Sequence, residues 1–159
     1  MDEMVTLRTV IAGGCLCGAI RYEVREEPLS AVYCHCRGCQ MAHASPSAAL
    51  ALIPPGGTVI TQGEPTRHEM TSNAGNGTFR EFCGACGTHL FSGGAAFPDF
   101  RTVKIVTLDD PSTISPVAHV WTKRRIDWSA IPEGLPEYSD EPEVSELERL
   151  WSDAKSGAA

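Results

Sequence analysis

The chain has 159 residues, of which 42% are hydrophobic and 21% charged, and its formal net charge is -7. This length suits one domain with a core of its own, and the composition is that of a globular protein. The negative charge argues against a nucleic-acid partner, because a polyanion would be repelled. The longest apolar run, residues 48–53, is too short to cross a bilayer, so no membrane partner is expected.

The first half of the chain predicts short strands separated by turns. Residues 19–24 alternate apolar and polar side chains, which is the pattern of a half-buried strand, and a continuous apolar run predicts a buried one. In chain order we expect a first strand that includes Val5 and Leu7 and ends before Gly13, strands over residues 19–24 and 31–33, one helical turn within residues 40–47, and a strand over residues 48–53.

The second half predicts paired strands followed by one helix. The expected strands cover residues 58–61, 66–70, 78–82, 88–91, 101–108 and 116–121, with loops at residues 71–77 and 93–100. Residues 123–136 have little periodicity, so we expect them to lie across the domain. Apolar residues recur at helical spacing in residues 141–151, which predicts an amphipathic helix with Ser139 or Asp140 as its N-cap. The expected fold is mainly β with a short C-terminal helix.

Seven cysteines carry the chemistry that the sequence predicts. A tetrahedral zinc ion needs four ligands, and thiolate sulfur is the usual choice in closed structural sites. An extended Cys-x-Cys segment projects both sulfurs from one face, so that Cys15 and Cys17 can act as a pair. With the later Cys-x-x-Cys they complete one shell, and we call these residues the four-cysteine cluster: Cys15, Cys17, Cys83 and Cys86.

The other cysteines lie within six consecutive positions, and we call them the cysteine triplet: Cys34, Cys36 and Cys39. Three protein ligands with a vacant fourth position is the arrangement of reactive zinc, in which water or substrate completes the shell. We therefore expect two zinc ions per chain, one structural and one open to a substrate. All-thiolate spacing favours zinc over iron.

Other interpretations of the cysteines stay open. Disulfides would use six of the seven, but Cys-x-Cys neighbours bridge poorly, and nothing at the N-terminus reads as a signal peptide. A redox pair at Cys36 and Cys39, or at Cys83 and Cys86, would leave the other cysteines unexplained. A single structural zinc ion beside a reduced triplet is the third alternative. Reduced cysteines predict a cytoplasmic protein.

Several segments together resemble the glutathione-dependent formaldehyde-activating (GFA) family, also called the centromere protein V/GFA domain. The resemblance rests on Gly-Cys-Leu-Cys-Gly at residues 14–18, Cys-His-Cys-Arg-Gly-Cys at 34–39, Phe-Cys-Gly-Ala-Cys-Gly at 82–87 with Leu90 and Phe91, Thr-Leu-Asp-Asp-Pro at 107–111, and Pro-x-x-His-Val-Trp at 116–121. It covers residues 13–138, with residues 1–12 as an N-terminal lead-in and residues 139–159 as a C-terminal helix and frayed tail. It implies an Mss4-like fold, in which zinc pins small β-sheets, and the same division of the cysteines into two zinc sites.

The resemblance also implies an activity, which is the joining of formaldehyde to glutathione to give S-hydroxymethylglutathione. This is formally a carbon–sulfur lyase reaction run in reverse, so the expected partner is a small-molecule thiol or thiol–aldehyde adduct such as glutathione. Zinc at the triplet would either bind the thiol and lower its pKa or polarise the aldehyde, and three donating thiolates favour thiol capture. The alternatives are a non-enzymatic zinc module that binds a protein, and a thiol-based zinc or redox sensor.

The histidines near the cysteines are secondary candidates. His35 lies between two ligands of an extended Cys-x-Cys, so we expect it to point away from the metal, either near the site or at the surface. His43 is either a proton shuttle at the triplet or a surface residue. His89 and His119 lie on expected strands and should be packed or hydrogen-bonded within the fold.

Three further kinds of residue complete the candidates. Arg37 would either attract a substrate carboxylate or be a solvated loop residue. Trp121 and Trp128 are expected in the aromatic core rather than in a pocket. Asp109 and Asp110 precede a proline and predict a turn, not a catalytic carboxylate pair.

Overall fold

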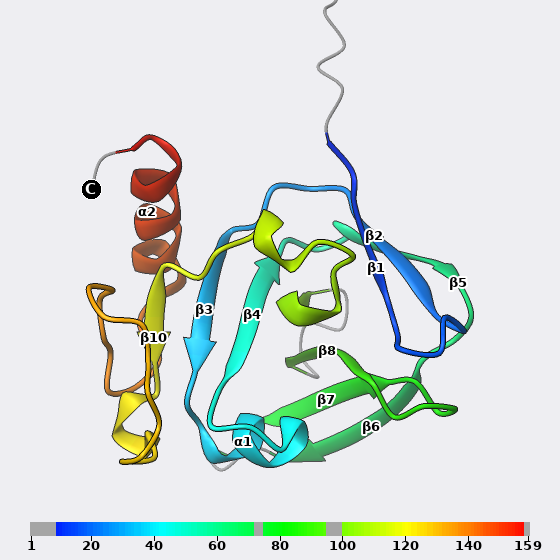
Figure 1. Ribbon diagram of the computed structural model, residues 1–159, viewed down its shortest axis with the longest axis horizontal. Helices are drawn as coiled ribbons and strands as arrows, with labels where there is room; N and C mark the ends of the chain where they lie inside the picture. The colour runs from blue at the N-terminus through cyan, green and yellow to red at the C-terminus, as the bar shows by residue number, and fades with distance from the viewer. Residues whose placement is uncertain (1–8, 72–74, 95–99, 158–159) are drawn as a thin grey trace, which may run out of the picture.

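The described residues, 9–71, 75–94 and 100–157, form two β-sheets in the computed structural model (Figure 1). The smaller sheet consists of β1 (Ile11–Gly14), β2 (Arg21–Val24) and β5 (Thr58–Gln62), in that order. The larger sheet consists, in spatial order, of β10 (Ala118–Val120), β3 (Ser30–Cys34), β4 (Ala48–Ile53), β9 (Arg101–Lys104), β8 (His89–Gly94), β7 (Gly77–Phe82) and β6 (Thr66–Thr71). Strands β10 and β3 pair in parallel, and the other neighbours pair antiparallel.

Two α-helices and three short 3-10 turns accompany the sheets within the described residues. They are α1 (Arg37–His43), α2 (Val144–Lys155), η1 (Ile105–Thr107), η2 (Pro111–Thr113) and η3 (Thr122–Arg124). None of the helices in this part of the chain has the length and apolar character that a membrane crossing needs. The expectation of a mainly β fold with a short C-terminal helix is confirmed, and cysteine clusters at the strand ends agree with an Mss4-like fold.

Several expected element boundaries are wrong, and local hydrogen bonds explain those of β9 and α1. The strand expected over residues 101–108 ends at Lys104, because the Thr107 hydroxyl donates to the Lys104 carbonyl at 2.8 Å and closes the turn η1. Helix α1 begins at Arg37, inside the triplet, because the Cys36 sulfur accepts from the Cys39 amide and acts as an N-cap. Helix α2 begins after Glu143, whose side chain makes no capping hydrogen bond, and not after Ser139 or Asp140.

The first strand also differs from the expectation. Val5 and Leu7 lie outside the described residues, and β1 includes Gly13 instead of ending before it. A Cβ added at Gly13 would lie 2.5 Å from the Tyr22 hydroxyl, so glycine lets the two strands and the buried ring approach closely. The loop expected at residues 93–100 is wrong at residues 93 and 94, which belong to β8, and the loop expected at residues 71–77 is wrong at its two ends, which belong to β6 and β7. The parts of these loops at residues 72–74 and 95–99 lie outside the described residues.

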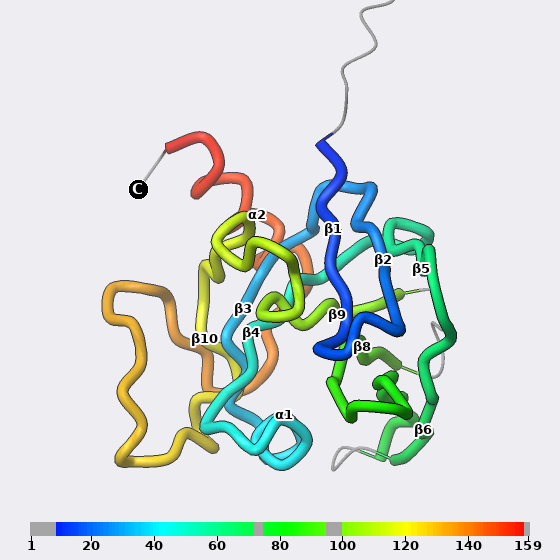
Figure 2. Tube along the Cα trace, turned by 45° about the vertical axis from the view of Figure 1, so that its right-hand side comes forward, coloured from blue at the N-terminus to red at the C-terminus, as the bar shows by residue number. Residues whose placement is uncertain are grey.

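The larger sheet has a hydrophobic core on each face. One core lies between the two sheets, where Tyr22 of β2 packs edge-on against Phe91 of β8 with ring centroids 4.8 Å apart. Figure 2 shows β1 and β2 lying in front of β8 and β9 at this place. The other core lies on the opposite face, where Leu147 of α2 packs with Val32, Leu50 and the cysteines of the triplet. The triplet is therefore built into the second core, and α2 covers part of it.

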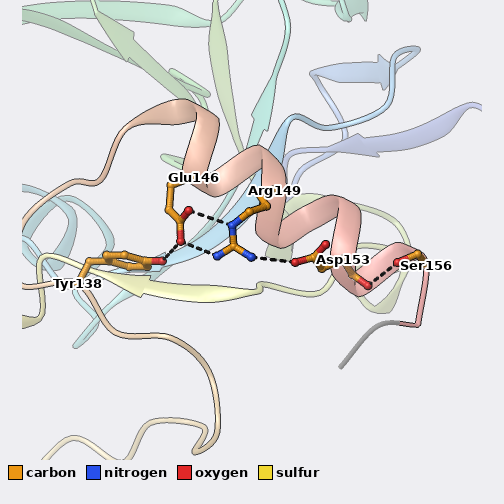
Figure 3. A network of polar contacts seen from close by, with 5 residues as sticks. All are labelled: Tyr138, Glu146, Arg149, Asp153 and Ser156. Atoms are coloured by element: carbon orange, nitrogen blue, oxygen red, sulfur yellow. Dashed lines mark hydrogen bonds and ion pairs between the residues drawn. The ribbon is translucent and has the colours of Figure 1, made fainter.

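A chain of polar contacts fixes α2 to the segment that follows β10 (Figure 3). The Tyr138 hydroxyl donates to Glu146 at 2.8 Å, and Arg149 bridges Glu146 and Asp153 at 2.7 and 2.8 Å. Arg149 first, and then Tyr138, lower the pKa of Glu146 to about 2. These contacts hold α2 to the segment after β10, and α2 itself packs on β3, the strand that ends at Cys34.

Stability at alkaline pH should depend on Tyr22. Its side chain is fully buried, and burial raises its pKa from 10.0 to about 12 despite a 2.6 Å hydrogen bond to the Thr107 hydroxyl. An acid whose pKa rises on folding keeps its stabilising contribution below the unfolded pKa and loses it as the pH approaches the folded value, so stability should fall between pH 10 and pH 12. A shift of two units corresponds to about 2–3 kcal/mol.

Thermal unfolding from pH 8 to pH 11.5 would measure this contribution in the wild type, Tyr22→Phe and Tyr33→Phe. Tyr22→Phe should be less stable at pH 8, because it lacks the hydrogen bond to Thr107, and should lose less stability as the pH rises. Tyr33→Phe should keep the wild-type dependence because Tyr22 is intact. Parallel curves for the wild type and Tyr22→Phe would contradict the assignment.

Candidate metal centre

The four-cysteine cluster joins two turns that lie far apart in sequence. Cys15 and Cys17 lie in a turn after β1, in which the Gly18 amide donates to the Cys15 carbonyl at 3.1 Å. The expectation of an extended Cys-x-Cys is therefore wrong at this place, although the sulfurs are still only 3.6 Å apart. Cys83 and Cys86 lie between β7 and β8 in a turn that ends at Gly87, whose φ of +78° favours glycine.

The spacing of these sulfurs fits a tetrahedral zinc ion. All four lie within 4.8 Å of one another, and Cys17 and Cys83, which come from different turns, are 3.8 Å apart. Zinc–sulfur bonds of about 2.3 Å place the sulfurs of a tetrahedral site about 3.8 Å apart. The residues present therefore fit a closed metal site.

Hydrogen bonds tie the two halves of this cluster together. The Thr88 hydroxyl accepts from the Leu16 amide at 3.1 Å and lies 3.2 Å from the Cys86 sulfur, to which it donates. This hydroxyl is the main reason that the pKa of Cys86 falls to about 5. Near pH 7 the side chain is then a thiolate, which is the form that a metal requires. The Ile20 amide donates to the Cys15 sulfur at 3.2 Å in the other half.

The cysteine triplet lies where β3 passes into α1. Cys34 ends the strand, Cys36 caps the helix, and Cys39 lies in its first turn. The three sulfurs lie within 4.8 Å of one another, and no histidine, aspartate or glutamate of the described residues joins them as a fourth ligand. The triplet thus offers three ligands and leaves one position of a tetrahedron free.

Hydrogen bonds among the thiols of the triplet shift their pKa values in opposite directions. Hydrogen bonds from Cys34 and Cys39 hold the pKa of Cys36 far below the usual range of a thiol. The same contacts raise the pKa of Cys34, because a second thiolate would lie beside the first in a mostly buried place. A cation bound here would replace these protons and neutralise the thiolate charge, so that the chemistry of the donor set fits zinc.

Two basic residues near the triplet were not among the candidates from the sequence. Lys104 is 1% exposed and pairs across the sheet with Leu50, which places it on the face that carries Cys34. Burial lowers its pKa to about 8, while the nearby Cys39 thiolate acts in the opposite direction. Arg80 of β7 reaches over the first turn of α1, since a Cβ at Gly38 would lie 2.9 Å from its guanidinium. A lysine within the apolar run around residues 103–106 was the available signal for the first of them.

The structure brings His35 and His119 together beside the triplet. Both are fully buried, and His35 Nε2 lies 3.0 Å from His119 Nδ1. His119 Nε2 donates to the Pro132 carbonyl at 3.0 Å, so its Nδ1 accepts from His35. His35 is therefore not a surface residue, and burial lowers its pKa. The expectation that His119 is packed and hydrogen-bonded is confirmed.

The other two candidate histidines lie side by side: His43 ends α1, and His89 begins β8. His43 is half-buried, and its Nδ1 donates to the Cys39 carbonyl at 2.7 Å. Burial lowers its pKa to about 4, so it is neutral near pH 7, and the alternative of a plain surface residue is wrong because the side chain is half-buried. His89 packs between His43 and Phe82, with ring centroids 5.6 and 5.5 Å away, as expected for a packed residue.

The remaining candidates lie in a helix, in the second core, at the surface or in a turn. Arg37 is a residue of α1, not of a loop, and donates to Gln40 at 2.7 Å. Trp121 packs against the second core, whereas Trp128 is 75% exposed and is not a core residue. Asp109 pairs with an arginine of β2, and Asp110 caps η2, so the expectation of turn chemistry is met at Asp110.

Comparisons with known proteins support the fold and the family. No curated protein matches the chain. A crystal structure of a Rhodobacter sphaeroides protein superposes with a TM-score of 0.51 at 22% identity, covering 69% of this chain and 99% of that one, and this likeness concerns the fold alone. The model of the glutathione-dependent formaldehyde-activating enzyme family matches residues 10–124, which include both cysteine clusters, Lys104 and His119. The chain therefore belongs to the glutathione-dependent formaldehyde-activating enzyme family.

Proposed function

We propose that the chain binds two zinc ions and catalyses the joining of a small-molecule thiol to an aldehyde at the cysteine triplet. The observation that carries this proposal is the difference between the two clusters: one offers four sulfurs, and the other offers three with no fourth ligand among the described residues. The family name points to glutathione and formaldehyde as the thiol and the aldehyde. The four-cysteine cluster would then be structural and the triplet reactive.

The reaction itself is a simple addition. A zinc ion held by the triplet would supply an exchangeable position at which a thiol loses its proton more easily. The sulfur of the thiol forms a bond to the aldehyde carbon, the carbon–oxygen double bond becomes a single bond, and the thiol proton ends on the oxygen. The product is a hemithioacetal, which carries an S-hydroxymethyl group when the aldehyde is formaldehyde, and the reverse reaction is a carbon–sulfur lyase reaction.

The residues around the triplet support this chemistry. Cys34 and Cys39 are buried, which keeps water away from two of the three sulfurs. Lys104 and Arg80 place positive charge beside the thiolates, and this charge stabilises an additional thiolate in a place of low dielectric. The hydrogen bond from His43 to the Cys39 carbonyl holds the helical turn that carries the third ligand.

Native mass spectrometry of the purified chain, with and without glutathione, tests the proposal. We expect two zinc ions per chain and a further mass of one glutathione when the thiol is present. Addition of carbon-13 formaldehyde should then form S-hydroxymethylglutathione faster than in the protein-free control, as followed by NMR. One zinc ion, or two without any bound thiol at millimolar glutathione, would favour a structural zinc module that binds a protein.

A further inference from the structure

A groove of about 470 Å³ lies beside the cysteine triplet. It is bounded by the end of α1, the start of β4, the turn that follows Cys86, and η1. Its wall includes Ala42 and His43, which follow Cys39 on the same helix, and Ala48, which pairs with Cys34 across the sheet. Its volume lies in the range of pockets that bind small molecules, about 300–1,000 Å³.

Lys104 lines this groove, and although the thiolates of the triplet act on its charge, few hydrogen bonds hold its ammonium group. The ammonium group donates to the Ser92 hydroxyl at 2.6 Å, and no other acceptor and no carboxylate pairs with it among the residues that the structure describes. An ammonium has three N–H donors, and a buried charge is costly unless it is paired. Such a lysine is suited to an anion that arrives with a ligand.

Two ring nitrogens of residues that line the groove also lack partners. His43 Nε2 and His89 Nδ1 are buried and have no hydrogen-bond partner in the described part of the chain. Neither aspartate nor glutamate occurs among the described residues that line the groove, although the chain as a whole carries a net charge of -7. Among the described residues the groove therefore has a lysine, no carboxylate, and two ring nitrogens without a hydrogen-bond partner next to the three thiols.

We propose that this groove binds the carboxylate end of the substrate, with Lys104 as the residue that recognises it. The substrate class is then a thiol that also carries a carboxylate, and its sulfur lies at the triplet while its charged end lies in the groove. Free ring nitrogens of His43 and His89 pair with amide or hydroxyl groups of the same molecule. This inference rests on the proposed function, because it assigns the sulfur end to the triplet.

Two thiols of equal length test the role of Lys104. The zinc-loaded wild type and Lys104→Met, both checked for zinc content, would be titrated with 3-mercaptopropionate and 3-mercapto-1-propanol by calorimetry. A hydrogen bond to a charged group predicts a preference of the wild type for the carboxylated thiol of about tenfold or more. Lys104→Met should weaken both thiols, because it removes positive charge beside the triplet, and should lose the preference for the carboxylated thiol, so the ratio of the two affinities is the quantity that tests the inference. Equal affinities in the wild type, or an unchanged preference in the variant, would overturn the inference.

A substitution at the surface provides a second test that does not alter a buried residue. Val106 lines the groove and is 72% exposed, so Val106→Glu places a carboxylate at its mouth and Val106→Gln is the matched neutral control. Val106→Glu should weaken 3-mercaptopropionate about fivefold, since like charges repel by roughly 1 kcal/mol at short range in water, and should leave the neutral thiol unchanged. The same affinity for both thiols in Val106→Glu and Val106→Gln would count against the groove.

Propionate without a thiol separates this inference from the proposed function. In the wild type it should shift the NMR signals of residues around the groove, such as Ala44 and Val106, whereas 1-propanol should not. If propionate binds but no thiol is captured at the triplet, the groove stands as an anion site and the proposed chemistry fails. If thiols bind but propionate produces no shifts, the chemistry stands and the groove assignment is wrong.

Discussion

Cys36→Ser should give a folded chain that binds one zinc ion instead of two and no longer captures a thiol. Cys36 is one of three ligands at the triplet, and it is half-buried, whereas Cys34 and Cys39 are buried in the second core. Even residues that only orient a metal ligand affect metal affinity by about 10–100-fold, so loss of a ligand should exceed this range. Serine is also a good N-cap, which preserves the start of α1.

Native mass spectrometry and thermal unfolding of the same sample would check this result. The expected outcome is one zinc ion, no glutathione adduct, and an unfolding temperature close to that of the wild type. Arg37→Gln is a suitable control, because it changes a neighbouring residue of α1 whose hydrogen bond to Gln40 is not part of the metal site. Global unfolding of Cys36→Ser would contradict the division into a structural and a reactive cluster.

Cys83→Ser should have the opposite effect and destabilise the whole fold. The Cys83 side chain is 2% exposed and belongs to the core between the two sheets, where it joins the end of β7 to the turn after β1. Structural zinc contributes on the order of 10 kcal/mol to the folding of small zinc domains, so loss of one ligand should cost several kcal/mol. At this chain length about 1 kcal/mol lowers the unfolding temperature by roughly 2–4 °C, which predicts a fall of about 10 °C.

Circular dichroism melts with and without a chelator would measure this effect. In the wild type, a chelator of moderate affinity should first remove the zinc ion of the triplet without loss of secondary structure, and only stronger chelation should unfold the chain. Cys83→Ser should unfold early in both conditions. A variant that melts like the wild type, while Cys36→Ser melts much earlier, would reverse the roles of the two clusters.

The local pattern of apolar and polar residues was enough to predict many of the strands. Residues 48–53 form β4 as expected, because a continuous apolar run bounded by prolines has few alternatives to a buried strand. Residues 101–108 were misjudged because alternation continued past Lys104, while the hydroxyl of Thr107 closed a turn that alternation does not record. Boundaries depended on individual hydrogen bonds, whereas the existence of a strand depended on its side-chain period.

The candidate site shows the same division between local and long-range information. The sequence by itself determined the two groups of cysteines, because their short spacings limit how the sulfurs can meet around one ion. Only the tertiary structure decided that Lys104 and Arg80 lie beside the triplet and that His35 pairs with His119, which is 84 residues away. These contacts depend on the order of the strands in the larger sheet, because that order brings segments that are distant in sequence onto one face. The spacing of residues along the chain does not record the order of the strands, so the contacts could not be predicted from it.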